Sequence, residues 1–296
     1  MSAVAPTRAQ VWWSAIRPKT LAAGAVPVAV GSALAAQAGA FDALPALAAL
    51  LGALLLQIGS NLANDVFDFL KGADDDARLG PARATQRGWL SPRQTMAGAG
   101  VVFGLAVLVG LYLVSVGGWP IVAIGVAGIV CAVAYTGGPV PLGYRGLGDP
   151  LVFIFFGPVA VLGTYYVQVG AVSWLAAWVS ASIGLLATAI LVVNNLRDRH
   201  TDARAGKRTL AVRLGATGAR REYVALIGLA YAIPTALAAV GLAGLGYLLP
   251  WLSSPLALQR VRAVVTLDGA ALNAELAATA RLTAVFGALL SVGVLL

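Results

Sequence analysis

Apolar residues run along this chain in stretches of about 20, the length an α-helix needs to cross a hydrocarbon core. We predict nine such spans, over residues 20–38, 44–64, 95–116, 120–136, 150–168, 173–193, 223–241, 245–259 and 281–296. The eighth is the weakest, because it is short and contains Pro250 and Pro255. The pattern predicts an all-α, polytopic membrane helix bundle, with residues 1–296 forming a single transmembrane domain.

The charged residues are segregated to one side of this alternating pattern. Every lysine and arginine falls before the first span or after an even-numbered span, within residues 1–19, 65–94, 137–149, 194–222 and 260–281, and so does every acidic residue except Asp42. Cytoplasmic loops of membrane proteins carry the excess of Lys and Arg. We therefore expect the N-terminus inside, the C-terminus outside, and an active site at the cytoplasmic face of the cell (inner) membrane.

Composition narrows the chemistry. Charged residues make up 11% of the chain, against about 25% in a soluble domain, which excludes an ordinary soluble fold. One cysteine and one histidine exclude a disulfide framework and a Cys/His metal site within one chain. The net charge of +8 reflects topology first and only then an anionic substrate. The lipid bilayer is the expected partner, and no nucleic acid is expected.

The end of the second span carries a dense polar cluster. Asn61, Asn64, Asp65 and Asp68 are spaced i, i+3, i+4 and i+7, so on a helix they share one face. The last two of the four, Asp65 and Asp68, lie beyond the apolar stretch itself. We expect this cluster at a helix end, beside a basic loop.

The end of the sixth span repeats the layout. Asn194, Asp198 and Asp202 are spaced four apart, and Asn195 precedes Asp198 by three, which again defines one helix face. Each cluster ends a span that runs from outside to inside, and each is followed by a basic loop. An internal structural repeat is one interpretation of this layout.

A bound cation explains why acidic side chains gather so close to hydrocarbon. Carboxylates one turn apart repel each other, and charged residues near the bilayer are costly. All of these ligands are oxygen donors, which suits Mg²⁺ rather than Zn²⁺ or copper. Mg²⁺ binds one or two carboxylates together with substrate phosphates, so the two clusters together suit a metal-bridged diphosphate. The alternative is ordinary polarity at helix ends, with each Asp solvated.

Basic and aromatic residues near the clusters supply the remaining parts of such a site. Lys71 follows the first cluster, and Lys207 and Arg208 follow the second. Lysine and arginine neutralise phosphates, although cytoplasmic anchoring explains basic loop residues equally well. Arg145 stands in a glycine-rich turn with little other charge, which favours a positioned role. Tyr135 begins that turn, and its ring could stabilise a cation or anchor at the interface.

From these patterns we predict three overlapping sets of site residues. The predicted catalytic residues are Asp65, Asp68, Asp198, Asp202, Tyr135 and Arg145. The predicted metal ligands are Asn64, Asp65, Asp68, Asn195, Asp198 and Asp202. The predicted substrate-binding residues are Asn61, Lys71, Tyr135, Arg145, Asn194, Lys207 and Arg208.

Together these motifs resemble the UbiA superfamily of membrane aromatic prenyltransferases. Asn64-Asp65-x-x-Asp68 is similar to the superfamily's first motif, and Asp198-x-x-x-Asp202 to its second. Within the superfamily the chain looks like the MenA type, the 1,4-dihydroxy-2-naphthoate polyprenyltransferases. The stretches that carry this closer resemblance are Asp68-x-x-x-Gly72-x-Asp74, residues 135–149, residues 155–166 and residues 206–215.

The resemblance implies a nine-helix fold around a lipid-open cavity, and it adds Asp74 to the expected metal ligands. It also implies that Mg²⁺ draws charge from a polyprenyl diphosphate. The ring of 1,4-dihydroxy-2-naphthoate would then attack, CO₂ and diphosphate would leave, and demethylmenaquinol would form in menaquinone biosynthesis. Rival interpretations are another aromatic acceptor, such as 4-hydroxybenzoate, and a non-enzymatic transporter of an anionic lipid. Transporters favour polar residues near the midplane, so the helix-end positions count against the latter.

Overall fold

The computed structural model describes residues 6–73 and 78–296, and every regular element within these ranges is helical. The α-helices are α1 (Arg8–Ile16), α2 (Pro18–Gln37), α3 (Ala43–Leu70), α4 (Pro92–Gly117), α5 (Trp119–Ala134), α6 (Gly148–Ile154), α7 (Gly163–Val169), α8 (Trp174–Arg204), α9 (Leu210–Ala239), α10 (Ser254–Thr266) and α11 (Leu272–Leu295). A π-helix covers Phe155–Leu162, and 3₁₀-helices cover Gly143–Arg145, Leu245–Ser253 and Gly269–Ala271. The predicted all-α fold class is confirmed.

Polar caps set where the helices begin. Asp42 precedes α3, and its side chain accepts a hydrogen bond from the backbone N–H of Leu44. Ser91 precedes α4 in a reciprocal capping box with Gln94. Ser173 caps α8 in the same position. Each cap satisfies a backbone donor that the first helical turn leaves without a partner.

Two helices extend past the apolar stretches that predicted them. α3 ends at Leu70 and α8 at Arg204, so the predicted span ends at residues 64 and 193 are too early as helix ends. Gly72 and Gly206 then adopt the left-handed backbone that stops a helix. Hydropathy marks where hydrocarbon ends, whereas the helix continues to its cap. The carboxylates of both clusters therefore lie on helical extensions.

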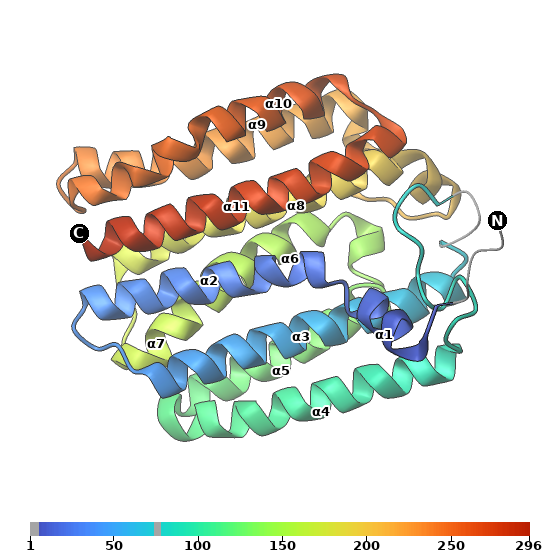
Figure 1. Cartoon of the computed structure of the whole chain (residues 1–296), viewed down its shortest axis with the longest axis horizontal. Coiled ribbons are helices and arrows are strands. Elements are labelled where there is room, and N and C mark those ends of the chain that lie inside the picture. Colours follow the sequence, from blue (N-terminus) through green and yellow to red (C-terminus); the bar gives the residue numbers. More distant parts are fainter. Residues whose placement is uncertain (1–5, 74–77) are drawn as a thin grey trace.

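The helices lie side by side along the long axis of the molecule (Figure 1). α8 is central in the bundle, because 67% of its most apolar 18-residue stretch is buried and it contacts α9, α11 and the π-helix. α4 lies at the edge of the bundle, and only 11% of its corresponding apolar stretch is buried. Its apolar side chains consequently face outwards, as lipid contact requires.

Seven helices in the described ranges are long and apolar enough to cross a membrane, and α5, with 16 residues, is apolar but shorter. The predicted eighth span is a 3₁₀-helix, Leu245–Ser253, continued by α10. The chain is thus a multi-pass membrane protein. That the chain crosses the membrane nine times, and on which side of the membrane each terminus lies, stay predictions.

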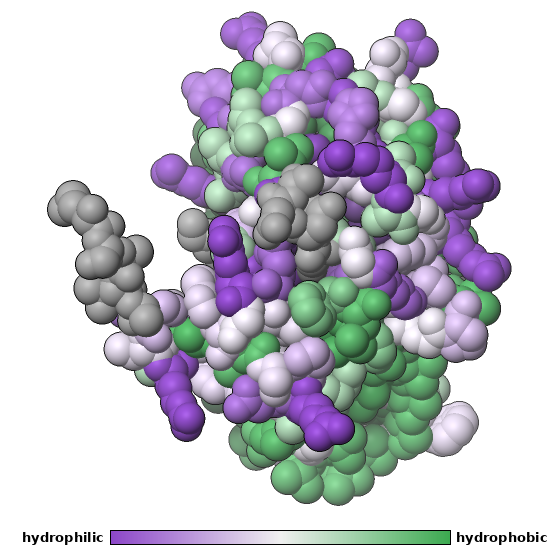
Figure 2. Space-filling view, turned by 90° about the vertical axis from the view of Figure 1, so that its right-hand side faces the viewer, coloured by the Kyte–Doolittle hydropathy of each residue, from purple (hydrophilic) through white to green (hydrophobic). Residues whose placement is uncertain are grey.

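The loops that carry the predicted site residues gather at one end of the bundle. The described parts of the α3–α4 loop (residues 71–73 and 78–91), the α5–α6 connection (residues 135–147) and the α8–α9 connection (residues 205–209) meet at the right-hand end of Figure 1. Figure 2 looks onto that end and shows hydrophilic residues spread across it, above an apolar flank. Asp42 lies at the opposite end, where α3 begins.

Candidate active site

The first acidic cluster occupies the last turns of α3. Asn61 donates hydrogen bonds to the backbone oxygen of Ile16, at 2.9 Å, and to the hydroxyl of Thr20, at 3.0 Å. Asn64 accepts one from the hydroxyl of Thr136 at 2.8 Å. Asp65 is buried and lines neither of the two cavities described below. Within the cluster, Asp68 is the side chain that faces the second cluster.

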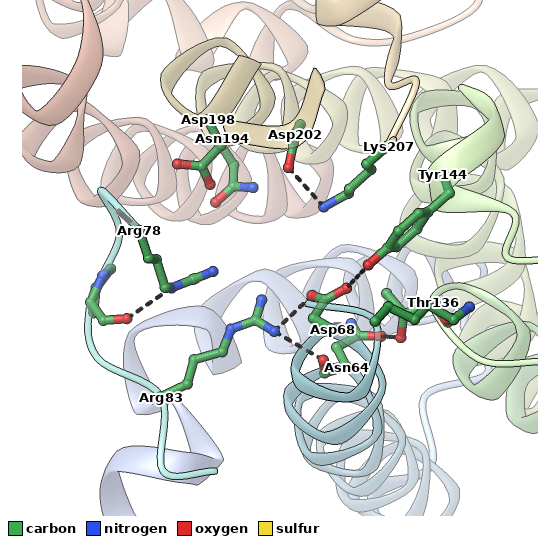
Figure 3. A network of polar contacts seen from close by, with 12 residues as sticks. Asn64, Asp68, Arg78, Arg83, Thr136, Tyr144, Asn194, Asp198, Asp202 and Lys207 are labelled. Atoms are coloured by element: carbon green, nitrogen blue, oxygen red, sulfur yellow. Dashed lines mark hydrogen bonds and ion pairs between the residues drawn. The ribbon is translucent and has the colours of Figure 1, made fainter. Parts of the chain in front are cut away.

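Asp68 is held by two donors from different loops. Nη1 of Arg83, from the α3–α4 loop, donates to Oδ2 of Asp68 at 2.7 Å and to the backbone oxygen of Asn64 at 2.9 Å. The hydroxyl of Tyr144, from the α5–α6 connection, donates to Oδ1 of Asp68 at 2.9 Å (Figure 3). Ionised hydrogen bonds of this kind are short and directional. The carboxylate is therefore fixed in both position and orientation.

The second cluster lies on the last turns of α8, opposite Asp68 (Figure 3). Asp202 forms an ion pair with Lys207, with Oδ1 and Nζ 3.5 Å apart. Asp198 pairs with its neighbour Arg197 through Nε at 2.8 Å and Nη2 at 2.5 Å. Asn194 stands one turn before Asp198 and lines the same pocket. Asn195 is buried and lines neither cavity.

A small polar pocket separates the two clusters, with a cavity volume of about 20 Å³. Its walls come from both clusters and from both basic loops. The lining residues are Asp68, Ala73, Arg78, Arg83, Asn194, Asp198, Thr201, Asp202 and Lys207. The structure thus brings together three of the predicted carboxylates, one predicted amide and one predicted lysine.

The donor set of this pocket fits Mg²⁺ bound with a diphosphate. Oδ2 of Asp202 is buried and accepts no hydrogen bond from the described residues, so it is available to a cation. In the parts of the chain that the structure describes, no three Asp, Glu, His or Cys side chains converge as a complete metal cage. Mg²⁺ does not need one, because it takes one or two carboxylates and fills its remaining positions with water and phosphate oxygens.

Two lysines flank the ring of Tyr144. Nζ of Lys71 lies 5.1 Å from the ring centroid and Nζ of Lys207 lies 5.5 Å from it. Burial alone would lower the pKa of Lys207, but the carboxylates of Asp68 and Asp202 outweigh it and raise that pKa. Lys207 therefore stays charged and can neutralise an anion. Nζ of Lys71 also donates to the backbone oxygen of Thr136 at 2.6 Å.

An apolar cavity of about 550 Å³ lies next to the polar pocket. On α3, Asn64 lines the cavity and Asp68, one turn further, lines the pocket. On α8, Leu191 likewise lines the cavity and Asn194, about one turn further, lines the pocket. Side chains from α2, α3, α4, α5 and the segment from Leu151 to Val167 form its walls. The cavity extends from the polar end into the apolar part of the bundle.

Tyr135 lines the cavity near its polar end, so its ring is available to a cation there. Phe155 and Phe156 add two more rings to the same wall.

Of the predicted site residues that the structure describes, five line the polar pocket and eight do not. Arg145 and Arg208 are exposed and line neither cavity. The hydrogen bonds that these two residues form use their own backbone atoms, not their guanidinium groups. Asp74 lies outside the described residues. Asn61 lines the apolar cavity rather than the polar pocket, although its amide group is also bonded to Ile16 and Thr20.

The structure adds Arg78, Arg83, Tyr144 and Arg197 to the site. The first two are loop arginines, and no spacing distinguished them from their neighbours in the sequence. Tyr144 stood in the glycine-rich turn beside Arg145, so the turn itself was the only signal. Arg197 is adjacent to Asp198 along the chain, and adjacent helical residues ordinarily point apart.

Comparison with known proteins places this site in a family. The sequence model described as "UbiA prenyltransferase family" matches residues 25–291. The 1,4-dihydroxy-2-naphthoate octaprenyltransferase of Mycobacterium tuberculosis is 44% identical over 219 residues, covering 74% of this chain and 75% of that protein. The protein of the same name from Escherichia coli is 42% identical, covering 75% and 74%. The one from Bacillus subtilis is 33% identical, covering 97% and 93%.

Solved structures show the same fold. The apo structure of a UbiA homolog from Aeropyrum pernix K1 has a TM-score of 0.69 at 17% identity, covering 90% of this chain and 96% of that one. A UbiA homolog from Archaeoglobus fulgidus bound to DMAPP and Mg²⁺ has a TM-score of 0.64 at 15% identity, covering 95% and 99%. The helical arrangement is therefore shared along nearly the whole length.

Proposed function

The chain belongs to the UbiA prenyltransferase family, and on that premise we propose that it transfers a polyprenyl group from polyprenyl diphosphate to 1,4-dihydroxy-2-naphthoate. CO₂ and diphosphate would be released and demethylmenaquinol formed, a step of menaquinone biosynthesis. One observation carries the proposal: carboxylates from two helix ends face each other across a basic pocket that adjoins an apolar cavity.

The polar pocket is the proposed site of the diphosphate and of Mg²⁺. Asp68, Asp198 and Asp202 would hold the ion, with Asn64, Asp65 and Asn195 remaining predicted ligands. The bound ion would neutralise charge on the diphosphate and so weaken the bond to the prenyl carbon. The likeness to a UbiA homolog solved with DMAPP and Mg²⁺ supports this assignment.

The basic residues around the pocket would bind the diphosphate. Arg83 and Lys207 are paired with Asp68 and Asp202 in the structure, so their charges are compensated without a substrate. Phosphate oxygens compete well for guanidinium and ammonium donors, and the carboxylates freed in this way would bind Mg²⁺. Arg78 lines the same pocket and adds a third cation.

The apolar cavity would hold the prenyl chain and the reacting carbon. The bond between C1 and oxygen breaks, and its electron pair leaves with the diphosphate. The allylic cation that remains needs a dry, aromatic environment, which Tyr135, Phe155 and Phe156 provide. The carboxyl-bearing ring carbon of the acceptor bonds to C1. The bond to the carboxylate then breaks, and its electrons restore the aromatic ring as CO₂ departs.

We infer that the site faces the cytoplasm from the inner membrane. The end of the bundle that carries the pocket is also the end that carries the loop lysines and arginines. The excess of these residues on cytoplasmic loops supports this orientation.

The test is the mass of the product made by the purified full chain from 1,4-dihydroxy-2-naphthoate and a set of prenyl diphosphates, with Mg²⁺ or with a chelator. We expect a prenylated product that lacks the carboxyl group, with diphosphate release that stops in the chelator. A product from 4-hydroxybenzoate instead would change the acceptor. Transport without diphosphate release would contradict an enzyme.

Matched variants test the acidic residues. Asp68→Asn and Asp198→Asn keep the shape of each side chain but remove its charge, so activity should fall by about two orders of magnitude or more. Asp42→Asn is the control, because Asn also caps a helix and Asp42 lies at the opposite end of the bundle. Wild-type activity in either of the first two variants would remove that residue from the site.

A further inference from the structure

Arg197 is an almost fully buried arginine beside the pocket. It belongs to α8, and only 1% of its surface is exposed. Besides its two bonds to Asp198, its Nη2 donates to Oδ1 of Asn194 at 2.8 Å. Its Nη1 donates to Oδ1 of Asn273, at the start of α11, at 2.9 Å. Nothing in the proposed reaction requires Arg197 to touch the substrate.

The pairing of Arg197 with Asp198 is unusual for neighbours on a helix. Consecutive helical side chains point in directions about 100° apart and do not face each other. Both carboxylate oxygens of Asp198 nevertheless accept from Arg197, so the guanidinium folds back across the helix. A planar two-point contact of this kind fixes the rotation of the carboxylate, which a lysine cannot do.

The same guanidinium reaches the α3–α4 loop through Asn273. Nδ2 of Asn273 donates to the backbone oxygen of Leu79 at 2.8 Å. Next to Leu79, a Cβ on Gly80 would lie only 2.9 Å from Nη2 of Arg197, so the loop backbone approaches the guanidinium directly. This loop supplies Arg78 and Arg83 to the pocket. One buried arginine therefore connects both sides of the site.

Stability alone does not account for this arrangement. A buried ion pair gains little over well-packed apolar residues, because desolvation offsets the attraction. A comparison pair exists two residues further along α8, where Arg199 binds both carboxylate oxygens of Asp268. That pair also ties α8 to the segment before α11, but it is partly exposed and lines neither cavity.

We propose that Arg197 is a positioning residue that orients Asp198 and Asn194 toward Asp68 and, through Asn273, holds the α3–α4 loop against the second acidic cluster. The inference rests on the proposed function, in which these groups hold Mg²⁺ and diphosphate. Without this link, the carboxylate would rotate freely and the loop arginines would no longer be fixed over the pocket.

The first measurement is Mg²⁺ binding by the purified full chain, followed as the rise in melting temperature with Mg²⁺, with and without inorganic diphosphate. Arg197→Lys keeps the positive charge but loses the two-point guanidinium contact with Asp198. Asn273→Ala leaves the Arg197–Asp198 ion pair in place but removes the hydrogen bonds that connect Arg197 to the α3–α4 loop. We expect both to raise the half-saturating Mg²⁺ concentration about tenfold, as loss of a group that orients a metal ligand does. Arg199→Lys, the matched control, should leave it unchanged.

The second measurement is limited trypsin digestion after Arg78 and Arg87, which flank the anchored part of the loop. Asn273→Ala and Arg197→Lys should be cut several-fold faster than the wild type, and Arg199→Lys at the wild-type rate. In the activity assay of Arg197→Lys and Asn273→Ala, the Mg²⁺ concentration that gives half-maximal activity should change by a larger factor than kcat at saturating Mg²⁺.

Unchanged Mg²⁺ affinity and unchanged cleavage in both variants would overturn the inference, even in a fully active enzyme. Equal effects in Arg199→Lys would also overturn it, since they would indicate a general loosening of α8. Failure of the wild type to make a prenylated naphthol product would instead refute the proposed function, while the Mg²⁺ and trypsin measurements would still report on Arg197.

Discussion

Tyr144 contacts one anionic and two cationic side chains beside the pocket. Its hydroxyl donates to Asp68, while Lys71 and Lys207 lie over its ring. A cation over an aromatic face is attracted by the ring itself, and the hydroxyl is not needed for that contact. The hydroxyl and the ring of Tyr144 therefore have separable roles.

Tyr144→Phe tests the hydroxyl alone. The ring and its lysines remain, but Asp68 loses a hydrogen bond to a charged group, a loss of about 1.5–3 kcal/mol. We expect kcat/KM to fall by about tenfold or more while the protein folds normally. Steady-state kinetics measure the loss. Tyr112→Phe on α4 is the control, since Tyr112 lines neither cavity and should retain wild-type kinetics.

At the scale of elements, α8 approaches α6 and the π-helix that continues it through two glycines. A Cβ on Gly184 would lie 2.7 Å from the backbone oxygen of Phe153, and one on Gly157 would lie 2.8 Å from that of Ser180. Small residues allow such close contact between membrane helices. The contact matters for the site because the π-helix carries Phe155 and Phe156 along the cavity wall.

Gly184→Leu should push α6 and the π-helix away from α8. Backbone lies against this position and cannot move aside, so we expect a destabilisation of about 1–3 kcal/mol and a lower melting temperature. Activity should fall as well, since the aromatic wall shifts. Gly104→Leu on α4 is the control, because a Cβ there meets no atom within 4 Å. Equal melting temperatures for the two variants would show that the glycine contact does not govern packing.

At the scale of the whole molecule, the size of the apolar cavity limits the donors that fit. Gly125 on α5 lines the cavity, and a Cβ there meets no atom within 4 Å. A large side chain at this position has room to enter the cavity without striking the backbone. It would take up space that the prenyl chain needs.

Gly125→Phe should therefore shift the preference toward shorter donors. We expect kcat/KM for a long polyprenyl diphosphate to fall about tenfold or more, while a short donor is used as well as before. A series of donor lengths with one acceptor measures the shift. Gly100→Phe on the outer face of α4 serves as the control. An equal loss for every donor length would point to misfolding rather than to a blocked cavity.

The orientation of the bundle gives a prediction at the same scale. In a Cys131→Ser background, Ala82→Cys lies in the α3–α4 loop and Ala171→Cys in the turn before α8, and both positions are exposed. A thiol reagent that cannot cross the membrane should label Ala171→Cys in intact cells and Ala82→Cys only after lysis, because the basic end faces the cytoplasm. The reverse labelling would invert the topology.

Local patterns predicted the scaffold of the site but not its contacts. The spacing of Asn64, Asp65 and Asp68 indicated one helix face, and the structure places all three on α3. Spacing could not reveal that Arg83 and Tyr144 bind Asp68, because they lie 15 and 76 residues away along the chain. Contacts of that kind depend on how separate segments pack.

Isolated charge was a poor guide to position. Arg145 stands alone in its turn, which favoured it over the loop arginines, yet it is exposed, and its catalytic and substrate-binding roles stay predictions. No sequence pattern singled out Arg83 from the other loop arginines, yet it is buried against Asp68. A charged side chain on a loop can point either way, and only the packing of the loop decides which.

The sequence by itself determined the membrane bundle, the two one-faced acidic clusters and the oxygen-donor chemistry, because helical periodicity and hydropathy are local properties of the chain. The resemblance carried by its motifs determined the family and the expected acceptor. Only the tertiary structure decided that Asp68 and Asp198 face one pocket, that an apolar cavity adjoins it, and that Arg197 joins α8 to the α3–α4 loop. These features arise where helices distant in sequence meet, and the packing between helices cannot be inferred from the local pattern of any single segment.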